Sequence, residues 1–208
     1  MQLLSALHWR YAARRFTQAR LPDQVIHSLV EATRLSASSY GLQPYRLIQV
    51  DSPALRAQLL PHAMGQQKVL ECSHLLVLAT ETNAGDATVD RYMALRGRLH
   101  DLTPEAQSGM ADHIKTVLSG MTVTERQAWA REQAFIALGT LLTAAALQNI
   151  DSCPITGFEA AGFDRVLGLP EQGLTATALC VLGHRHPDDD QADLPKVRLA
   201  PREFVQVV

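Results

Sequence analysis

The chain has 208 residues, of which 47% are hydrophobic and 19% are charged, with 19 Lys and Arg against 21 Asp and Glu. This composition predicts a folded protein with one large domain or two small ones and excludes a disordered chain. The formal net charge of −2 offers no general attraction to nucleic acid or to an anionic membrane, and no apolar run reaches the roughly 18 residues of a membrane span.

The first predicted helix covers residues 2–14. The segment lacks the basic n-region and the cleavage-like site of a signal peptide, so we expect it to belong to the mature protein. Arg10 and Arg14 are four residues apart and are therefore predicted to share one face of this helix. A second helix is expected from near Pro22, and the polar stretch 36–44 ends it.

Two strands and two helical segments are predicted next. Residues 45–50 form the first strand, and Pro53 suits the first turn of a short helix. The nearly continuous apolar run 74–80 predicts a strand that is covered on both faces. Residues 86–120 have a more polar helical pattern, which is broken at 103–104.

The strongest helical pattern opens at Thr124, where the sequence Thr-Glu-Arg-Gln has the form of a capping box, and it continues to about Gln148. This helix is apolar almost all round, so it must be buried on every side. It is either the central helix of the domain or part of a subunit interface. Its small residues permit close approach of another backbone, and we predict that it has both roles in an obligate homodimer.

The last predicted elements are a helix at 159–167, a strand at 175–183, and an edge strand at 204–208 for this sheet or for that of another subunit. No repeat or linker divides the chain, so a single domain over residues 1–208 is predicted. The order of strands and helices lacks a regular βαβ rhythm, which favours the α+β class.

Cysteine and histidine usage indicates neither a disulfide framework nor a metal site. Cys72, Cys153 and Cys180 are odd in number and form no CxxC pair, and buried thiols of this kind fit a reducing cytoplasm. The histidines and carboxylates of residues 184–190 follow a predicted strand and are interpreted as a surface loop.

Three features suit the binding of a phosphate or of a ring, and each also has an ordinary structural interpretation. The arginine pair of the first helix, together with Lys196 and Arg198, could hold a phosphate or merely suit a helix C-terminus and solvent. The loop 36–45 offers hydroxyls and an amide, or is a plain turn. The turn 154–157 could present backbone N–H groups or only reverse the chain.

Taken in order, these segments resemble the FMN-dependent nitroreductase family. The N-terminal pattern of that family is matched by Arg10, Tyr11, Arg14 and Phe16, while Ala12 stands where the family has Ser.

Four further segments carry the resemblance along nearly the whole chain. Residues 38–45 resemble the Ser/Asn-rich loop ending in Gln-Pro-aromatic, in a version typical of a bacterial branch. Lys68 matches a lysine beside the flavin, and residues 154–157 resemble Pro-Ile-Glu-Gly with Thr156 in place of the acid. Residues 194–198 match the C-terminal pattern Leu-Pro-Lys-x-Arg.

The resemblance implies a mixed, largely antiparallel sheet flanked by helices, in an intertwined homodimer with two FMN molecules at its interface. It implies that Arg10, Lys196 and Arg198 hold the FMN phosphate, with Tyr11 and the backbone of Ala12 alongside. Three cations around a dianion are electrostatically reasonable, because charge-assisted hydrogen bonds are the strong ones.

The resemblance also assigns residues to the flavin ring. Arg14 and Lys68 are expected at the pyrimidine edge, where a fixed cation favours the reduced flavin. The other subunit is expected to line the ring with Ser38, Ser39, Tyr40 and Gln43. The region near flavin N5 is expected to be formed by Pro154, Ile155, Thr156 and Gly157.

The implied activity is hydride transfer from NADH or NADPH to flavin N5 and then to a nitroaromatic, a quinone or a similar flat acceptor, in a ping-pong cycle. The cofactor carries the chemistry, so no catalytic side chain is predicted. The helices of residues 86–120 are expected to overhang the flavin and to influence acceptor choice. Two alternatives stay open: a flavin or dihydropteridine reductase on the same fold, and a non-catalytic ligand-binding dimer.

Overall fold

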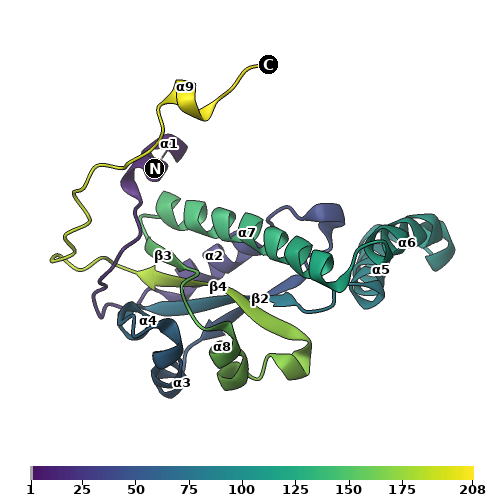
Figure 1. Cartoon of the computed structure of the whole chain (residues 1–208), viewed down its shortest axis with the longest axis horizontal. Helices are drawn as coiled ribbons and strands as arrows, with labels where there is room; N and C mark the ends of the chain where they lie inside the picture. The colour runs from purple at the N-terminus through teal and green to yellow at the C-terminus, as the bar shows by residue number, and fades with distance from the viewer. Residues whose placement is uncertain (1) are drawn as a thin grey trace.

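An antiparallel sheet of four strands lies between two layers of helices in the computed structural model, which describes residues 2–208 (Figure 1). The strands run in the order β1-β2-β4-β3 and are β1 (Tyr45–Val50), β2 (His74–Glu81), β4 (Leu174–Gly183) and β3 (Asp151–Ile155). All three ladders are antiparallel, and the one parallel pairing between described residues is an isolated bridge of Ala12 to Ser152. The α+β prediction is confirmed.

Each face of the sheet packs against its own set of helices. Helices α2 (Asp23–Arg34) and α7 (Val123–Leu147) cover one face, and α3 (Pro53–Leu59), α4 (Lys68–Glu71) and α8 (Ala160–Leu167) cover the other (Figure 1). The alternation of side chains along β2 divides the core accordingly. Leu76 and Leu78 pack with α7, whereas Leu75 and Val77 pack with α3 and α8.

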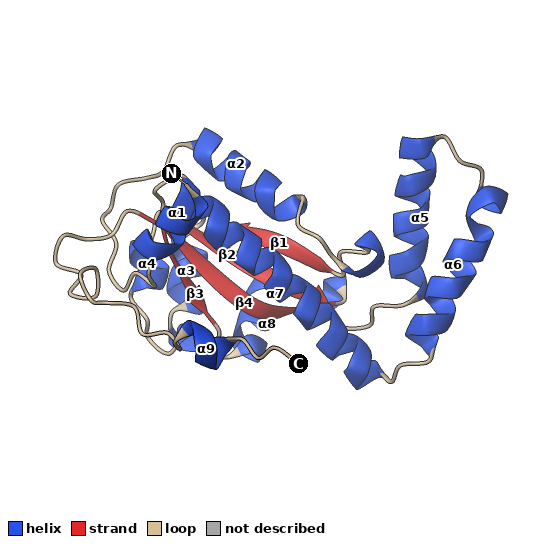
Figure 2. Cartoon of the chain, turned by 90° about the horizontal axis from the view of Figure 1, so that it is seen from above, coloured by secondary structure: helices blue, strands red, loops and turns tan. Residues whose placement is uncertain are grey.

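Three short 3₁₀ helices and two peripheral pairs of helices complete the chain. The 3₁₀ helices are η1 (Ser39–Gly41), η2 (Pro61–Ala63) and η3 (Pro170–Gln172). Helices α5 (Asp86–His100) and α6 (Pro104–Ser119) form a hairpin that projects from the body (Figure 2). The predicted break at 103–104 is confirmed, and Thr103 caps α6. Helices α1 (Leu3–Trp9) and α9 (Pro201–Phe204) are the first and last helices of the described residues (Figure 1).

Helix α1 ends at Trp9, so the predicted helix over 2–14 is too long and Arg10 and Arg14 do not share a helical face. The backbone of Arg10 is extended, with φ −69° and ψ 143°. The segment that follows is held by the edge of the sheet, because Ala12 bridges Ser152 of β3 and the N–H of Ala13 donates to the carbonyl of Ser152. Sheet contacts that are distant in sequence outweigh the local helical pattern here.

The N-cap of helix α7 lies two residues before the one that the sequence pattern indicated. The N-cap is Thr122, whose hydroxyl accepts from the N–H of Glu125 while the Glu125 carboxylate accepts from the N–H of Thr122. A carboxylate in the first turn also suits the helix dipole, which the Gln of the predicted box does not. The helix lies over the centre of the sheet, but Ile136 is 49% exposed, so one chain does not bury it on every side.

The C-terminal segment runs past α1 and away from the sheet (Figure 1). The predicted edge strand at 204–208 is not formed on this sheet, because Phe204 ends α9 and residues 205–208 pair with no strand of the same chain, while its addition to another subunit's sheet stays a prediction. Several of its apolar side chains are exposed, with Val197 at 89% and Val207 at 91%. Among the helices of residues 2–208, none has the length and apolar character needed to cross a membrane.

Candidate functional site

Three cations from the two ends of the chain gather beside the start of β3. The ammonium group of Lys196 donates a hydrogen bond to the backbone carbonyl of Arg10. Burial lowers the pKa of Arg10, and the charge of Arg198 lowers it further. Burial, and then the charges of Arg10 and Arg198, lower the pKa of Lys196 in the same way. The hydrogen bond from Lys196 to Arg10 brings residues 186 positions apart into one site.

No carboxylate of the described residues balances these three cations. Within residues 2–208, neither Arg10, Lys196 nor Arg198 forms an ion pair with a carboxylate. The Nε of Arg10 is buried and has no hydrogen-bond acceptor. A buried donor without a partner costs about 1–3 kcal/mol, and repulsion among like charges adds to this cost. A phosphate dianion would satisfy both the free donor and the excess charge.

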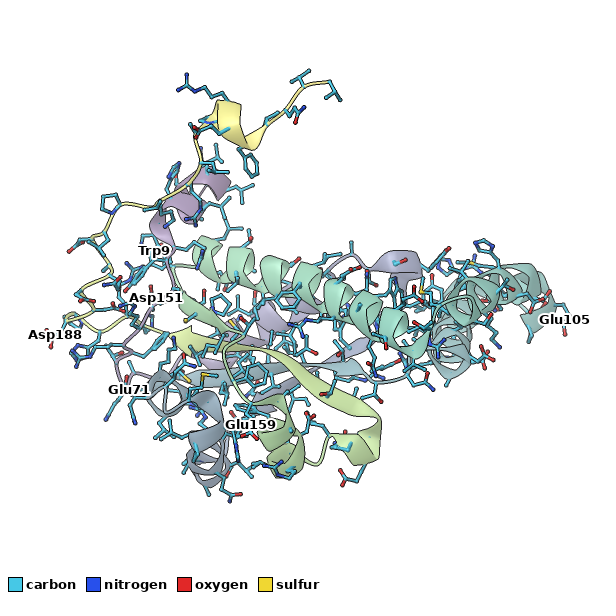
Figure 3. All side chains as sticks on the ribbon, in the orientation of Figure 1. Trp9, Glu71, Glu105, Asp151, Glu159 and Asp188 are labelled. Carbon is cyan, nitrogen blue, oxygen red and sulfur yellow. The ribbon has the colours of Figure 1, made fainter. Side chains whose placement is uncertain are left out.

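A fourth cation, Arg185, lies beside this group and is paired with Asp151, although its charge also lowers the pKa of Lys196. Its guanidinium lies over the rings of Trp9 and Tyr11, at 4.4 and 4.5 Å from their centroids. Its Nε and Nη2 are each 2.6 Å from Asp151 Oδ1, and its backbone N–H donates to Asp151 Oδ2 at 2.8 Å. Trp9 and Asp151 lie at the same end of the sheet (Figure 3).

A second buried carboxylate, that of Asp189, fixes the next part of the N-terminal segment. Its Oδ2 accepts from the N–H of Arg14 at 2.7 Å and from that of Arg15 at 3.2 Å. Burial acts to raise the pKa of Asp189, but these backbone N–H groups, with that of Gln191, bring it below its usual value. Burial first, and then Asp189, raise the pKa of Tyr11, so the phenol stays protonated.

The far end of β3 carries a second group of the predicted residues. The ammonium of Lys68 lies 3.2 Å from the thiol sulfur of Cys153, which is buried in β3 directly before Pro154. Gln66 donates from Nε2 to the carbonyl of Gly157 at 2.9 Å and so holds the residues that follow the strand.

Residues 154–157 do not form one turn, as the sequence pattern had indicated. Pro154 and Ile155 belong to β3, and only Thr156 and Gly157 lie beyond it, both exposed. Proline fits here because β3 is an edge strand, where an absent N–H donor does not break a ladder.

Strand β3 therefore connects the two groups. Its first residue, Asp151, holds Arg185, its second pairs with Ala12, and its third contacts Lys68. Arg14 lies in the same extended segment, with an exposed side chain. One chain thus brings the cations and the residues of 154–157 along a single edge of the sheet.

The predicted loop residues lie at the opposite end of the sheet. This loop leads into β1, whose first residue pairs with Thr80, whereas Asp151 is at the end where β2 begins. Ser39 donates its N–H to Gln133, Gln43 donates from Nε2 to the carbonyl of Arg34, and the N–H of Gln43 donates to Ser38. One chain does not bring Ser38, Ser39, Tyr40 and Gln43 to the cations. Their contribution from a partner subunit stays a prediction.

The loop is also strained. Tyr40 and Gln43 have φ values of 53° and 46°, which L-residues other than glycine seldom adopt. Strain of this kind costs on the order of 1–3 kcal/mol per residue and is concentrated at functional sites.

The sequence patterns did not indicate Asp151, Arg185 and Asp189, although these residues organise the site. Residues 184–190 had been interpreted as a surface loop, yet Asp189 is only 4% exposed. One available signal is the charge of Asp151 directly after the apolar Ile150, at the first position of a buried strand. The structure shows no group of three or more His, Cys, Asp or Glu positioned to hold a metal ion in the part of the chain that it describes.

The pattern that defines the Nitroreductase family matches residues 7–184, which include all four strands. The chain belongs to the nitroreductase family. It is 28% identical to the oxygen-insensitive NAD(P)H nitroreductase of Enterobacter cloacae, over 96% of this chain and 96% of that protein. The predicted family membership is thereby confirmed.

Solved structures show that the nitroreductase fold extends over the whole chain. The ydfN protein of Bacillus subtilis superposes with a TM-score of 0.87 at 20% identity, covering 99% of this chain and 98% of that one. A protein of Exiguobacterium sibiricum, solved in complex with FMN, has a TM-score of 0.85 at 19% identity and covers 100% and 98%. These similarities confirm the predicted fold.

Proposed function

We propose that this nitroreductase-family chain is an FMN-dependent oxidoreductase that takes electrons from NADH or NADPH and passes them to a flat conjugated acceptor. The observation that carries the proposal is the cluster of Arg10, Lys196 and Arg198, which has no carboxylate partner among residues 2–208 and includes a buried free donor. The name of the Enterobacter relative and the FMN bound by the Exiguobacterium protein support the same donor and cofactor.

The cation cluster is the proposed site of the FMN phosphate. Arg10 supplies its free Nε, while Lys196 and Arg198 supply the remaining charge. Tyr11 and the backbone of Ala12 lie alongside in the extended segment. Because Ala12 has no hydroxyl, the affinity for phosphate rests on the three cations.

The other end of β3 is the proposed site of the isoalloxazine ring. When bound, FMN supplies the capacity to accept a hydride and to release it again. Arg14 and Lys68 place positive charge at the pyrimidine edge, which favours the reduced form. The ring is lined by Pro154, Ile155, Thr156 and Gly157, and Gln66 keeps Gly157 in place. No side chain acts as a covalent nucleophile.

The assembly is proposed to be a homodimer in which the whole chain, residues 1–208, forms one flavin-binding domain per subunit. Apolar side chains are exposed on α1, on α7 and along the tail, including Leu4 at 71%. Contiguous exposed apolar surface marks interaction sites. The dimer also brings Ser38, Ser39, Tyr40 and Gln43 of one subunit to the cations of the other. Light scattering after gel filtration should give twice the mass of one chain.

Donor and acceptor are proposed to occupy the same place in turn, with nitroaromatics and quinones as acceptors. The α5–α6 hairpin is proposed to overhang this place and to select among acceptors. Steady-state assays test the proposal with NADH or NADPH as the electron donor and with menadione, a nitroarene or free FMN as the electron acceptor. Turnover of menadione or the nitroarene with parallel double-reciprocal plots supports it. Activity with free FMN alone would contradict the proposed acceptors.

A further inference from the structure

We propose that Arg185 is a positioning residue for the phosphate site, which holds Trp9 and Tyr11 so that Arg10 between them is directed at the phosphate. The inference rests on the proposed binding of FMN. It concerns a residue of the loop 184–190, which follows β4 and returns to the N-terminal segment.

The local geometry couples Arg185 to Arg10. The backbone of Arg10 is extended, with the polyproline-like angles φ −69° and ψ 143°, and it joins Trp9 directly to Tyr11. Trp9 and Tyr11 both place their rings against the guanidinium of Arg185. Fixing these two rings therefore fixes the direction of the Arg10 side chain, whose free Nε is buried.

The sheet anchors Arg185 itself. Asp151 is 5% exposed, lies at the first position of β3, and receives hydrogen bonds from both the side chain and the backbone of Arg185. The next residue, Ser152, accepts from the N–H of Ala13. The contacts on both sides of Arg10 thus begin from neighbouring residues of one strand.

Arg185 differs from the three proposed phosphate ligands in its charge balance. Asp151 pairs with it at 2.6 Å, whereas Arg10, Lys196 and Arg198 have no such partner within residues 2–208. Its two ring contacts are cation–π interactions, each worth roughly 0.5–2 kcal/mol. The planar fork of the guanidinium reaches both rings and Asp151 at once, which a lysine ammonium does not do.

The test is a double-mutant cycle on FMN affinity, measured by flavin fluorescence at fixed ionic strength, with riboflavin as a ligand that lacks the phosphate. Arg185→Lys keeps the charge but loses the fork and the stacking. We expect it to weaken FMN binding about tenfold, within the range of coupling energies for residues in contact. Riboflavin affinity should stay as in the wild type. In an Arg10→Ala background the same change should cost less than about twofold, because contacts that act through one residue are not additive.

Control variants separate positioning from other roles. In an Arg198→Ala background, Arg185→Lys should still cost about tenfold, because Arg10 remains. Arg20→Lys, at an exposed arginine that pairs with Asp51 instead, should leave FMN affinity unchanged. If Arg185→Lys does not fold, Trp9→Leu takes its place, because it removes one ring and keeps the ion pair of Arg185 with Asp151. Trp9→Leu should also weaken FMN binding.

Four results would overturn the inference. The first is an FMN affinity that is unchanged in Arg185→Lys, or in Trp9→Leu if Arg185→Lys does not fold. The second is a loss of FMN affinity that is equally large in the Arg10→Ala background, which indicates an independent contact. The third is a loss of riboflavin affinity as large as that of FMN affinity, which indicates general destabilisation. The fourth is a wild-type protein that binds no FMN, which would overturn the proposed function as well. FMN binding that depends on Arg10 but not on Arg185 would overturn this inference alone.

Discussion

Replacing Arg198 by alanine should have opposite effects on the protein with and without FMN. Arg198 lowers the pKa values of both Arg10 and Lys196, so without an anion its charge is repulsive. Its removal should leave the melting temperature of the FMN-free protein unchanged or slightly raised. With FMN bound, the same removal should take away one of the three charge-assisted contacts proposed for the phosphate.

The size of the loss follows from the exposure of the site. Two unit charges at about 4 Å attract by roughly 1 kcal/mol in water and roughly 4 kcal/mol near a protein surface. Arg198 is exposed, so about 1.5–3 kcal/mol is expected, which is the range for a hydrogen bond between charged groups. This corresponds to a loss of FMN affinity of about 10- to 150-fold, since 1.4 kcal/mol is a factor of ten.

Fluorescence titration of the FMN-free protein measures this affinity, and thermal melts with and without FMN measure the two stabilities. Arg202→Ala is the matched control, because it removes the same charge from α9 on the same tail. If Arg198→Ala kept stoichiometric FMN through dialysis, or lost no more affinity than Arg202→Ala, the assignment of the phosphate site would be wrong.

Three further predictions concern the ring site and the core. Arg14→Ala should keep FMN bound and make its midpoint potential more negative, and an unchanged potential by dye equilibration would remove Arg14 from the ring. Arg56 is buried and donates hydrogen bonds to the carbonyls of Val50, Cys72 and Ser73. Arg56→Met should therefore lower the free energy of unfolding, measured in urea, by about 3 kcal/mol or more. A loss of less than about 1 kcal/mol would contradict this prediction. Burial, and then the charge of Arg20, lower the pKa of His74, so the unfolded chain binds the extra proton. Stability should therefore be full above about pH 6.5 and fall below it, and urea midpoints of His74→Asn should show a flatter decline.

The elements with strong local patterns could be predicted from the sequence. The strand at 45–50 and the two helices broken at 103–104 are formed as expected, because hydrophobic period and proline placement determine them locally. The C-terminal boundary of the first helix could not be predicted in this way. The helical spacing of Arg10 and Arg14 continues past Trp9, but Ser152 and residues of the loop 184–189, far away in sequence, hold the following residues in an extended form.

The candidate site was predictable only in part. The resemblance identified Arg10, Lys196 and Arg198, and the structure places them together. It did not indicate Asp151, Arg185 and Asp189, because their role lies in orienting other residues rather than in a recognisable motif. Buried carboxylates that receive backbone N–H groups become visible only when the fold is known.

The central claim is that the cations at the two chain ends bind the phosphate of FMN in a flavoenzyme. The measurement that tests it most directly is the absorbance spectrum of the purified protein, before and after addition of FMN and removal of the unbound cofactor. The account predicts flavin absorbance at one FMN per chain, which anaerobic addition of NADH or NADPH bleaches. A colourless protein that gains no flavin absorbance on addition of FMN would contradict it.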